Sequence, residues 1–289
     1  MSFTKKRIDV TIKLGKGQFG EDGVNDTVTL TGHRTIVNIS APGGGSMGAL
    51  QMRMYGLTPD LMNKLTTIGP INATVVKNSV YVSAGDETGM SQIYAGTISE
   101  AWGDFQPPPD VSFNIVALCG LIEAVKPIPP VSYKGPTDAA TIMASIAKTM
   151  GVAFENNGVT AQIHDPYYPG TAWQQAQTCS MAGDFRMVLD RGTLAIWPKS
   201  GARGGGIPLI SPATGLVGYP AFSSKNLTIT CTFNPNIIPG GQIDVQSSIT
   251  MARGRMNVVG VSHAIESERP GGAWFTRIEC FPATSTGTT

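Results

Sequence analysis

The sequence predicts a β-rich α+β protein in which two similar β-barrel units flank a small module of helices and hairpins. Three observations lead to this fold class. The chain of 289 residues contains 35 glycines and 20 prolines, which is typical of short strands separated by turns. An alternating apolar strand followed by a proline turn occurs twice. Between the two occurrences the apolar period changes from that of strands to that of helices.

The repeated pattern begins with an alternating strand, at 50–54 in the first copy and 227–231 in the second. Each strand leads into a turn that contains a proline. Three further strand-like stretches follow in each copy, the second of them passing through a glycine and the last opened by an aromatic residue. These stretches cover 78–82, 94–98 and 113–115 in the first copy, and 241–245, 259–263 and 274–278 in the second. The spacing differs between the copies, so two unrelated antiparallel sheets are the alternative interpretation.

Three segments follow from these patterns. Residues 1–130 are expected to form the first β-barrel unit, with one short helix at 60–65. Consecutive prolines at its end can neither donate to a β-ladder nor continue a helix. Residues 131–200 are expected to form the α+β module, and 201–289 the second β-barrel unit. The glycine-rich stretch 200–206 predicts a flexible connector between them.

Two helix-plus-hairpin patterns fill the predicted middle module. The first helix is expected to start at Asp138 and to end at Gly151, because apolar residues between them share one helical face. A hairpin through an Asn-Asn-Gly turn should follow it. The second pattern repeats this order. The predicted helices and strands cover 138–150, 152–154, 159–161, 171–182, 185–189 and 193–197.

The charge content limits the possible partners. The chain has 21 Lys+Arg and 20 Asp+Glu, so a concentrated basic face for nucleic acid or acidic lipid is not expected. Charged residues make up only 14%, against roughly 25% in ordinary soluble domains. This deficit suggests that neighbouring subunits cover much of the surface. The longest apolar run, 115–122, is too short for a membrane helix, and the first residues lack the apolar core of a signal peptide.

Two glycine motifs imitate phosphate-binding loops. The G-x-G-x-x-G matches at 15–20 and 43–48 are each followed by a turn or strand rather than by a helix whose N-terminus could hold phosphate. The first also imitates a protein-kinase loop, but the remaining kinase motifs are missing. We therefore expect a β-turn at the first match and a mobile loop at the second.

The residue types that usually carry catalysis or bind metals are scattered. No H-E-x-x-H or C-x-x-C motif occurs and no G-x-S-x-G nucleophile elbow is expected, so we expect no catalytic residue, no cofactor and no metal site. The cysteines are expected to be buried, reduced thiols. The aromatic stretch 165–173 is expected to be a helix-entry turn, with a binding lip as the alternative. The scattered residues are His33, His164, His263, Cys119, Cys179, Cys231 and Cys280.

The segment 233–245 reads as a strand end, an Asn-Pro turn and a Pro-Gly-led strand. It resembles the second barrel of baseplate hub proteins of contractile-tailed bacteriophages, the late control D type hubs, which are related to the hub part of the type VI secretion spike. The stretches 192–198 and 218–220 are also similar to this family. The resemblance covers about 50–285, and we expect no appended lysozyme-like or spike domain.

The resemblance implies a structural, non-enzymatic baseplate hub in the virion, assembled in the host cytoplasm. In that family a homotrimer presents six barrels as a ring, with the tail tube or tube-initiator protein above it and the spike protein below. Other baseplate proteins would be further partners. The alternative function is a carbohydrate-binding or cell-wall-hydrolysing β-protein, which would need a buried carboxylate pair or an aromatic platform.

Overall fold

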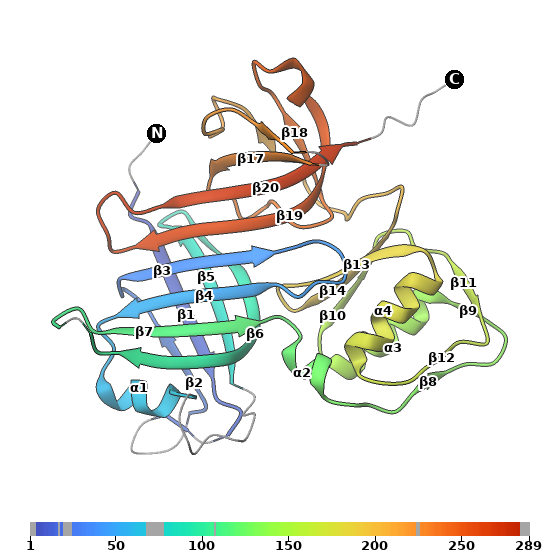
Figure 1. Ribbon diagram of the computed structural model, residues 1–289, viewed down its shortest axis with the longest axis horizontal. Helices are drawn as coiled ribbons and strands as arrows, with labels where there is room; N and C mark the ends of the chain where they lie inside the picture. Colours follow the sequence, from blue (N-terminus) through green and yellow to red (C-terminus); the bar gives the residue numbers. More distant parts are fainter. Residues whose placement is uncertain are drawn as a thin grey trace. The chain divides into compact units, whose positions relative to one another are not determined.

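The computed structural model describes residues 4–16, 18–19, 25–67, 78–106, 108–223 and 226–283. The chain divides into two compact units (Figure 1), which are described separately. Unit 1 consists of Met1–Ile39, Met47–Ile122 and Ala264–Trp274, and unit 2 of Ser40–Ser46, Glu123–His263 and Phe275–Thr289. The β-rich α+β class predicted from the sequence is confirmed. The sheets are open, however, and the described residues contain no closed barrel of strands.

Unit 1 contains an antiparallel sheet in the order β3-β4-β7-β6-β5-β1-β2, the short helix α1 and the first residues of the short helix α2. One face of each strand is buried, because apolar residues alternate along it. Leu50, for example, pairs with Ala117, and Met52 pairs with Ile115. The elements are β1 Arg7–Lys13, β2 Thr27–Leu30, β3 Thr35–Ala41, β4 Ala49–Tyr55, α1 Pro59–Leu65, β5 Ser79–Asp86, β6 Gly89–Asp104, β7 Ser112–Leu118 and α2 Leu121–Val125.

Helix α1 follows β4 where the sequence predicts a helix. The hydroxyl of Thr58 accepts a hydrogen bond from the backbone N–H of Leu61, and Pro59 occupies the first turn, where its missing N–H costs nothing. Met62 and Leu65 are the buried residues of this helix. The proline turn of the first repeat is therefore the start of a helix.

The second β-unit lies mainly in unit 2, apart from the end of β19 and the first residue of β20. Its strands follow the order β16-β17-β20-β19, with β18 beside β19 and β15 beside β18. Apolar residues from β15, β17, β18, β19 and β20 form one core, which includes Ile229, Ile243 and Ile278. The elements are β15 Leu209–Ile210, β16 Ala221–Phe222, β17 Leu227–Thr232, β18 Gln242–Val245, the 3-10 helix η1 Thr250–Ala252, β19 Gly254–Ser267 and β20 Trp274–Pro282.

The repeat predicted from the sequence has the same strand order in both copies. The first copy runs β4-β7-β6-β5 across the sheet, and the second runs β17-β20-β19-β18. The registers also correspond: Met52 pairs with Ile115 in one copy, and Ile229 pairs with Ile278 in the other. The copies differ at the next strand, because β1 is antiparallel to β5 whereas β15 is parallel to β18.

The predicted helices of the middle segment are confirmed. Asp138 caps α3 through a bond from the N–H of Thr141, and Gly151 ends it at φ +74°, a conformation that favours glycine. A capping box of Thr171 and Gln174 starts α4. The elements are β8 Val131–Ser132, β9 Pro136–Asp138, α3 Ala139–Met150, β10 Ala153–Asn156, β11 Gln162–His164, β12 Tyr167–Tyr168, α4 Ala172–Ala182, β13 Phe185–Asp190 and β14 Thr193–Pro198.

The hairpin predicted between 152–154 and 159–161 is wrong, whereas the β13–β14 hairpin is confirmed. Strand β10 pairs in parallel with β14, and β11 pairs with β9. The reason is the side chain of Asn156, whose Oδ1 accepts from the N–H of Val159 and whose Nδ2 donates to the carbonyl of Val159. This local turn satisfies Val159 without a hairpin and leaves β10 free to join β14.

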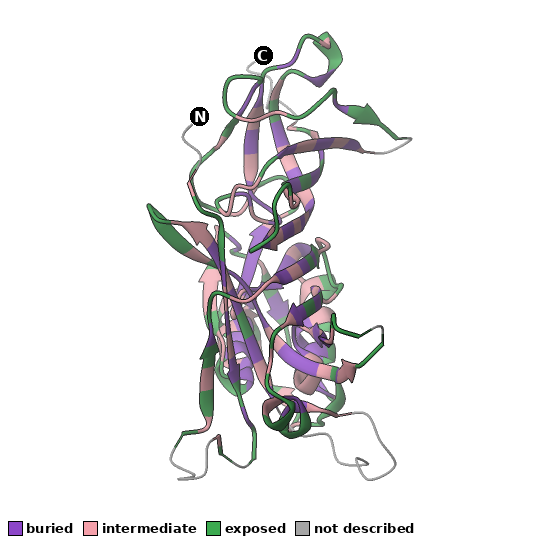
Figure 2. Cartoon of the chain, turned by 90° about the vertical axis from the view of Figure 1, so that its left-hand side faces the viewer, coloured by how far each residue is buried: buried purple, intermediate pink, exposed green. Residues whose placement is uncertain are grey.

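The burial pattern agrees with this architecture, since buried residues follow the strands and exposed residues gather at strand ends and turns (Figure 2). No helix among the described residues is long and apolar enough to cross a membrane.

The buried cross-strand pair of the second repeat gives a stability prediction. We expect Ile278→Ala to lower the free energy of unfolding by about 2–5 kcal/mol, because the side chain is fully buried and its removal leaves a cavity. Urea unfolding would measure the change. The neighbouring exposed substitution Glu279→Ala is the control and should stay within about 0.5 kcal/mol of the unaltered protein. Equal losses for the two variants would contradict the assigned face of β20.

Candidate functional site

The structure places the three histidines in separate environments. The Nδ1 of His33 lies 3.1 Å from the carbonyl oxygen of Tyr55, and His164 is exposed on β11. His263 is buried on β19. Among the residues with described positions, no group of three or more His, Cys, Asp or Glu side chains could hold a metal ion.

All four cysteines are buried free thiols, as the sequence predicts. Burial raises the pKa of the Cys179 and Cys280 thiols to about 12 and that of Cys231 to about 11. Since the thiolate is the reactive form, these side chains are chemically inert packing groups at neutral pH.

The first glycine motif connects two strands. Part of 15–20 lies outside the described residues, but Phe19 bridges to Asn25 and the next element is β2. The N–H of Gly15 donates to the side chain of Asn78. Among the described residues the next element is a strand rather than a helix whose N-terminus could hold phosphate.

The second glycine motif joins β3 to β4. At Gly43 a Cβ atom would lie 2.0 Å from the carbonyl oxygen of Val259, so only glycine fits there. The carbonyl of Gly45 accepts a hydrogen bond of 2.9 Å from the Gln177 side chain. The sequence predicts a mobile loop here, whereas the loop is packed and hydrogen-bonded by its own chain.

The aromatic stretch 165–173 is mostly a packed turn. Tyr168 and Trp173 are buried, and Tyr167 is exposed. The helix-entry interpretation therefore describes two of its three aromatic side chains.

The segment that carries the family resemblance forms a junction between the middle segment and the second β-unit. We call residues 234–240 the Asn-Pro junction. The Oδ1 of Asn234 accepts from the N–H of Asn236, and the N–H of Asn234 donates to the hydroxyl of Thr276. Ile237 is buried in the β-unit core. The Asn-Pro turn is thus hydrogen-bonded to β20.

Arg191 connects the turn between β13 and β14 to this junction. Its Nη1 donates to the carbonyl of Pro235 at 2.8 Å, and its Nη2 lies 3.5 Å from the carbonyl of Ile237. Burial lowers the pKa of Arg191, and the positive charge of Arg203 adds to this effect while Asp190 opposes it. The guanidinium group therefore satisfies two carbonyls that the irregular backbone leaves unpaired.

Trp197 and Gly240 form the second contact of the junction. Gly240 adopts φ +82°, and a Cβ atom there would lie 2.5 Å from the Trp197 ring. The N–H of Gly240 donates to the carbonyl of Val258. Glycine is thus required at position 240 for two reasons: the backbone angle is positive, and an indole ring lies where a side chain would be.

Arg203 forms the third contact. It is only 8% exposed, and it binds Glu155 through Nε and Nη2 at 3.1 and 3.0 Å and Asp190 through Nη1 at 3.1 Å. Its backbone N–H donates to the carbonyl of Gly240. Next to it, the N–H of Gly204 donates to the side chain of Asn157. The prediction of a flexible connector at 200–206 is therefore corrected: these contacts anchor the segment at Arg203 and Gly204.

The charges around Arg203 support one another. Burial acts to raise the pKa of Glu155, but hydrogen bonds from Arg203 and Asn157 outweigh it and the pKa is lowered. Burial likewise acts to lower the pKa of Arg203, and its two carboxylate partners raise it instead. Both shifts favour the ionised forms of Glu155 and Arg203, so these two groups form a charged, partly buried ion pair, which together with Asp190 we call the Arg203 clamp.

The segment before β17 carries an exposed apolar surface that was not predicted from the sequence. The stretch 207–222 contains no charged residue. Several of its apolar side chains are exposed, and the exposed fraction reaches 75% at Tyr219 and 59% at Phe222. Contiguous exposed apolar surface is typical of protein interfaces. The absence of charge along this stretch was the signal that could have identified it. The exposed members are Ile207, Leu209, Val217, Tyr219 and Phe222.

The Arg203 clamp gives a second prediction. We expect Arg203→Met to lower the free energy of unfolding by about 3–5 kcal/mol, because it leaves Glu155 and Asp190 without their buried partner. The exposed pair of Lys199 and Asp184 is the matched control. Lys199→Met should change stability by less than about 1 kcal/mol. Denaturant unfolding measures both, and an Arg203→Met variant as stable as the control would contradict the clamp.

His263 gives a prediction of pH dependence. Burial, with a further contribution from Arg191, lowers its pKa from 6.5 to about 3. Its Nδ1 lies 3.0 Å from the hydroxyl of Thr276. Below pH 6.5 the unfolded chain binds a proton that the folded chain does not. The stability that this group contributes is therefore complete above pH 6.5 and is lost as the pH falls from 6.5 towards 3.

We expect His263→Asn to flatten the dependence of unfolding free energy on pH by up to about 1.4 kcal/mol per pH unit between pH 6 and 4. His164→Asn, at an exposed position, should leave the slope unchanged. Chemical unfolding at several pH values measures the slopes. Parallel curves for the unaltered protein and His263→Asn would show that this histidine is not buried in its neutral form.

Comparison with solved structures identifies the same fold in phage tail proteins. The 43 kDa tail protein of prophage MuSo2 from Shewanella oneidensis shares 11% identity at a TM-score of 0.62, over 95% of this chain and 97% of that one. A tail protein from Neisseria meningitidis MC58 shares 10% identity at a TM-score of 0.63, over 94% and 96% of the two chains.

A third similar structure is the E. coli c3393 protein, a component of the type VI secretion system that is similar to the T4 bacteriophage tail proteins gp27 and gp5. It shares 12% identity at a TM-score of 0.56, over 86% of this chain and 74% of that one. No curated protein matches the chain by sequence. The family model of baseplate hub gp41 matches residues 7–259, which is most of the chain. The chain therefore belongs to the baseplate hub gp41 family and is a structural, non-enzymatic component of a phage tail baseplate.

Proposed function

We propose that three copies of this chain form a closed homotrimeric ring, in which six similar β-units connect a six-fold tail tube to a three-fold spike. The observation that carries this proposal is the equal strand order of the two repeats. A chain with two similar β-units can match a six-fold partner through six units and a three-fold partner through three chains. The same ring would thus accommodate both symmetries.

In this proposal the chain has three parts, at 1–130, 131–200 and 201–289, and the two β-parts take the places of the barrels in the ring without being closed. The second β-part supports this. In the segment 209–217, Leu209 pairs with Asp244 on β18. Farther along, the N–H of Val217 donates to the carbonyl of Thr230 on β17. One short segment thus hydrogen-bonds to β18 and to β17, the first and last strands of the order β17-β20-β19-β18.

The uncharged stretch 207–222 is the proposed contact with a neighbouring subunit. Its side chains would be covered in the ring, which also accounts for the low charge content of the chain. Pro208 and Pro220 flank β15 and β16, and proline cannot donate to a ladder. The contact is therefore expected to depend on apolar side chains more than on strand pairing. The tube protein or tube initiator, the spike and other baseplate proteins complete the proposed partners.

Mass photometry tests the trimer. At micromolar concentration we expect a species of three times the 30.4 kDa chain mass. Phe222→Glu should shift the distribution towards single chains, because it places a charge in the proposed contact. Met181→Glu introduces the same charge at a position that is 73% exposed on α4 and should leave the trimer intact. A stable monomer or dimer, with or without tube protein, would exclude the ring.

A further inference from the structure

One face of the unit 1 sheet is hollowed. The hollow has a volume of about 390 Å³ and lies over β3, β4, β6 and β7. It is on the side opposite the core, because the exposed Gln51 and Arg53 alternate along β4 with the buried Met52. Its volume falls in the range of small-ligand pockets, roughly 300–1,000 Å³.

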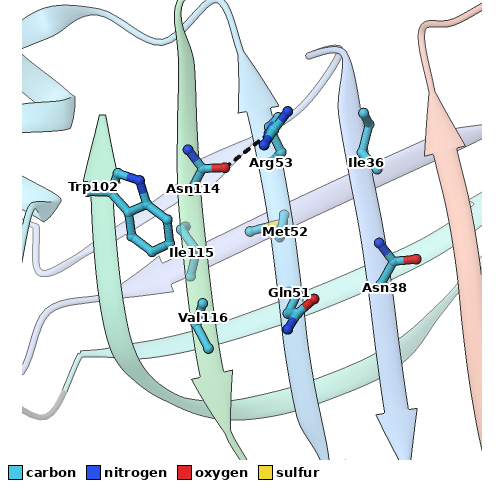
Figure 3. A pocket seen from close by; sticks show the side chains of 9 residues that line it. All are labelled: Ile36, Asn38, Gln51, Met52, Arg53, Trp102, Asn114, Ile115 and Val116. Carbon is cyan, nitrogen blue, oxygen red and sulfur yellow. Dashed lines mark hydrogen bonds between the residues drawn. The ribbon is translucent and has the colours of Figure 1, made fainter. Parts of the chain in front are cut away.

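The polar lining consists of amides and one guanidinium group. Asn38, Gln51 and Asn114 supply three primary amides from three neighbouring strands, and Arg53 is the one charged residue among the described lining. No carboxylate belongs to this described lining. Trp102 of β6 stands at its edge, on the far side of β7 from Arg53 (Figure 3). The hollow is therefore cationic, rich in hydrogen-bonding groups and bordered by an apolar ring.

Asn114 and Arg53 hold each other in position. The Nε of Arg53 donates to the Oδ1 of Asn114 at 3.0 Å, shown by the dashed line in Figure 3. Asn114 is only 9% exposed, so its amide is fixed at the floor of the hollow. This bond uses one N–H of the guanidinium and leaves its Nη1 and Nη2 edge for another acceptor. That edge is suited to a bidentate bond with a carboxylate.

We propose that this hollow binds an extended acidic peptide segment of a partner protein. Charge complementarity supports this occupant, since Arg53 is a cation without a carboxylate in the hollow. A primary amide donates and accepts at once, as does each peptide group, so Asn38 and Gln51 can bind a peptide backbone while Arg53 binds a Glu or Asp side chain. An apolar neighbour in the peptide would pack on Trp102. Saccharide hydroxyl groups fit less well, because carboxylate acceptors for them are missing.

The second repeat offers a matched position. In the common register, Arg53 pairs with Asn114 in the first copy, and Arg277 pairs with Thr230 in the second. Arg277 is also an exposed arginine on the face opposite a core, but it does not line this hollow. Its substitution removes the same charge from the corresponding cross-strand pair, on the strand that matches β7, which makes it the control for net charge and for the general behaviour of exposed arginines.

The test uses the full chain and a fluorescent, acetylated decapeptide in which Glu alternates with Leu, at low salt. Fluorescence anisotropy is expected to show saturable binding that weakens at least tenfold in Arg53→Gln and less than twofold in Arg277→Gln. Asn114→Asp, a nearly isosteric change, should also weaken binding at least tenfold, because its carboxylate would neutralise the charge of Arg53 and repel the acidic peptide. The thermal midpoint of each variant shows that it is folded.

The proposal would be overturned by no binding of the peptide, by equal loss in Arg53→Gln and Arg277→Gln, or by equal binding of the counterpart peptide with Gln in place of Glu. Competition by a neutral chito-oligosaccharide that depends on Arg53 would also overturn it, in favour of a saccharide site. The measurement does not depend on the subunit number. A failure here is therefore distinguishable from a failure of the trimer proposal, which mass photometry reports separately.

Discussion

The arrangement of unit 2 depends on two buried arginines. Arg203 forms ion pairs with Glu155 and Asp190, and Arg191 binds the carbonyls of Pro235 and Ile237. Burying such charges is costly in itself, and a buried ion pair adds little net stability over a well-packed apolar cluster. What the charges supply here is geometry, because a guanidinium group satisfies several acceptors in fixed directions. The connector, the β13–β14 turn and the Asn-Pro junction are held in one arrangement by these bonds.

Trp197 and Gly240 add shape to this electrostatic arrangement. The indole ring rests where any side chain at 240 would have to be, so the Pro-Gly element and the end of β14 are matched to each other. His263 lies in the same region, beside Phe233 with ring centroids 5.4 Å apart, and is kept neutral by its burial and by the charge of Arg191. The residues that resemble the hub family thus serve to join two parts of a scaffold. This is consistent with a structural protein.

The surface shows where such a scaffold can meet partners. Two repeats with the same strand order present similar outer faces, but their side chains differ: the first carries Arg53 and Asn114 where the second carries Thr230 and Arg277. Equal topology permits similar units to occupy similar places in a symmetric assembly. Different side chains at corresponding positions allow each unit its own partner. The uncharged stretch 207–222 is a separate surface, and its chemistry favours a permanent protein contact.

Local patterns in the sequence were sufficient for much of the fold. The caps at Asp138 and Thr171, the stop at Gly151 and the alternation along β4 and β17 are determined by residues within a few positions of each other. Short-range sterics and hydrogen bonds decide such features, so they can be recognised without a structure. The hub resemblance and the buried thiols also came from the sequence alone.

Long-range pairing decided the rest. The parallel pairing of β10 with β14 joins residues about 40 positions apart, and the local turn at Asn156 that permits it looks like a hairpin turn in the sequence. The anchoring of 200–206 depends on Arg203 meeting carboxylates from two distant strands. Open sheets rather than closed barrels, and a hollow assembled from four strands, are likewise set by tertiary contacts. A one-dimensional pattern records which residues can pair, but the partner that a strand edge or a buried charge finds is chosen only when the chain folds.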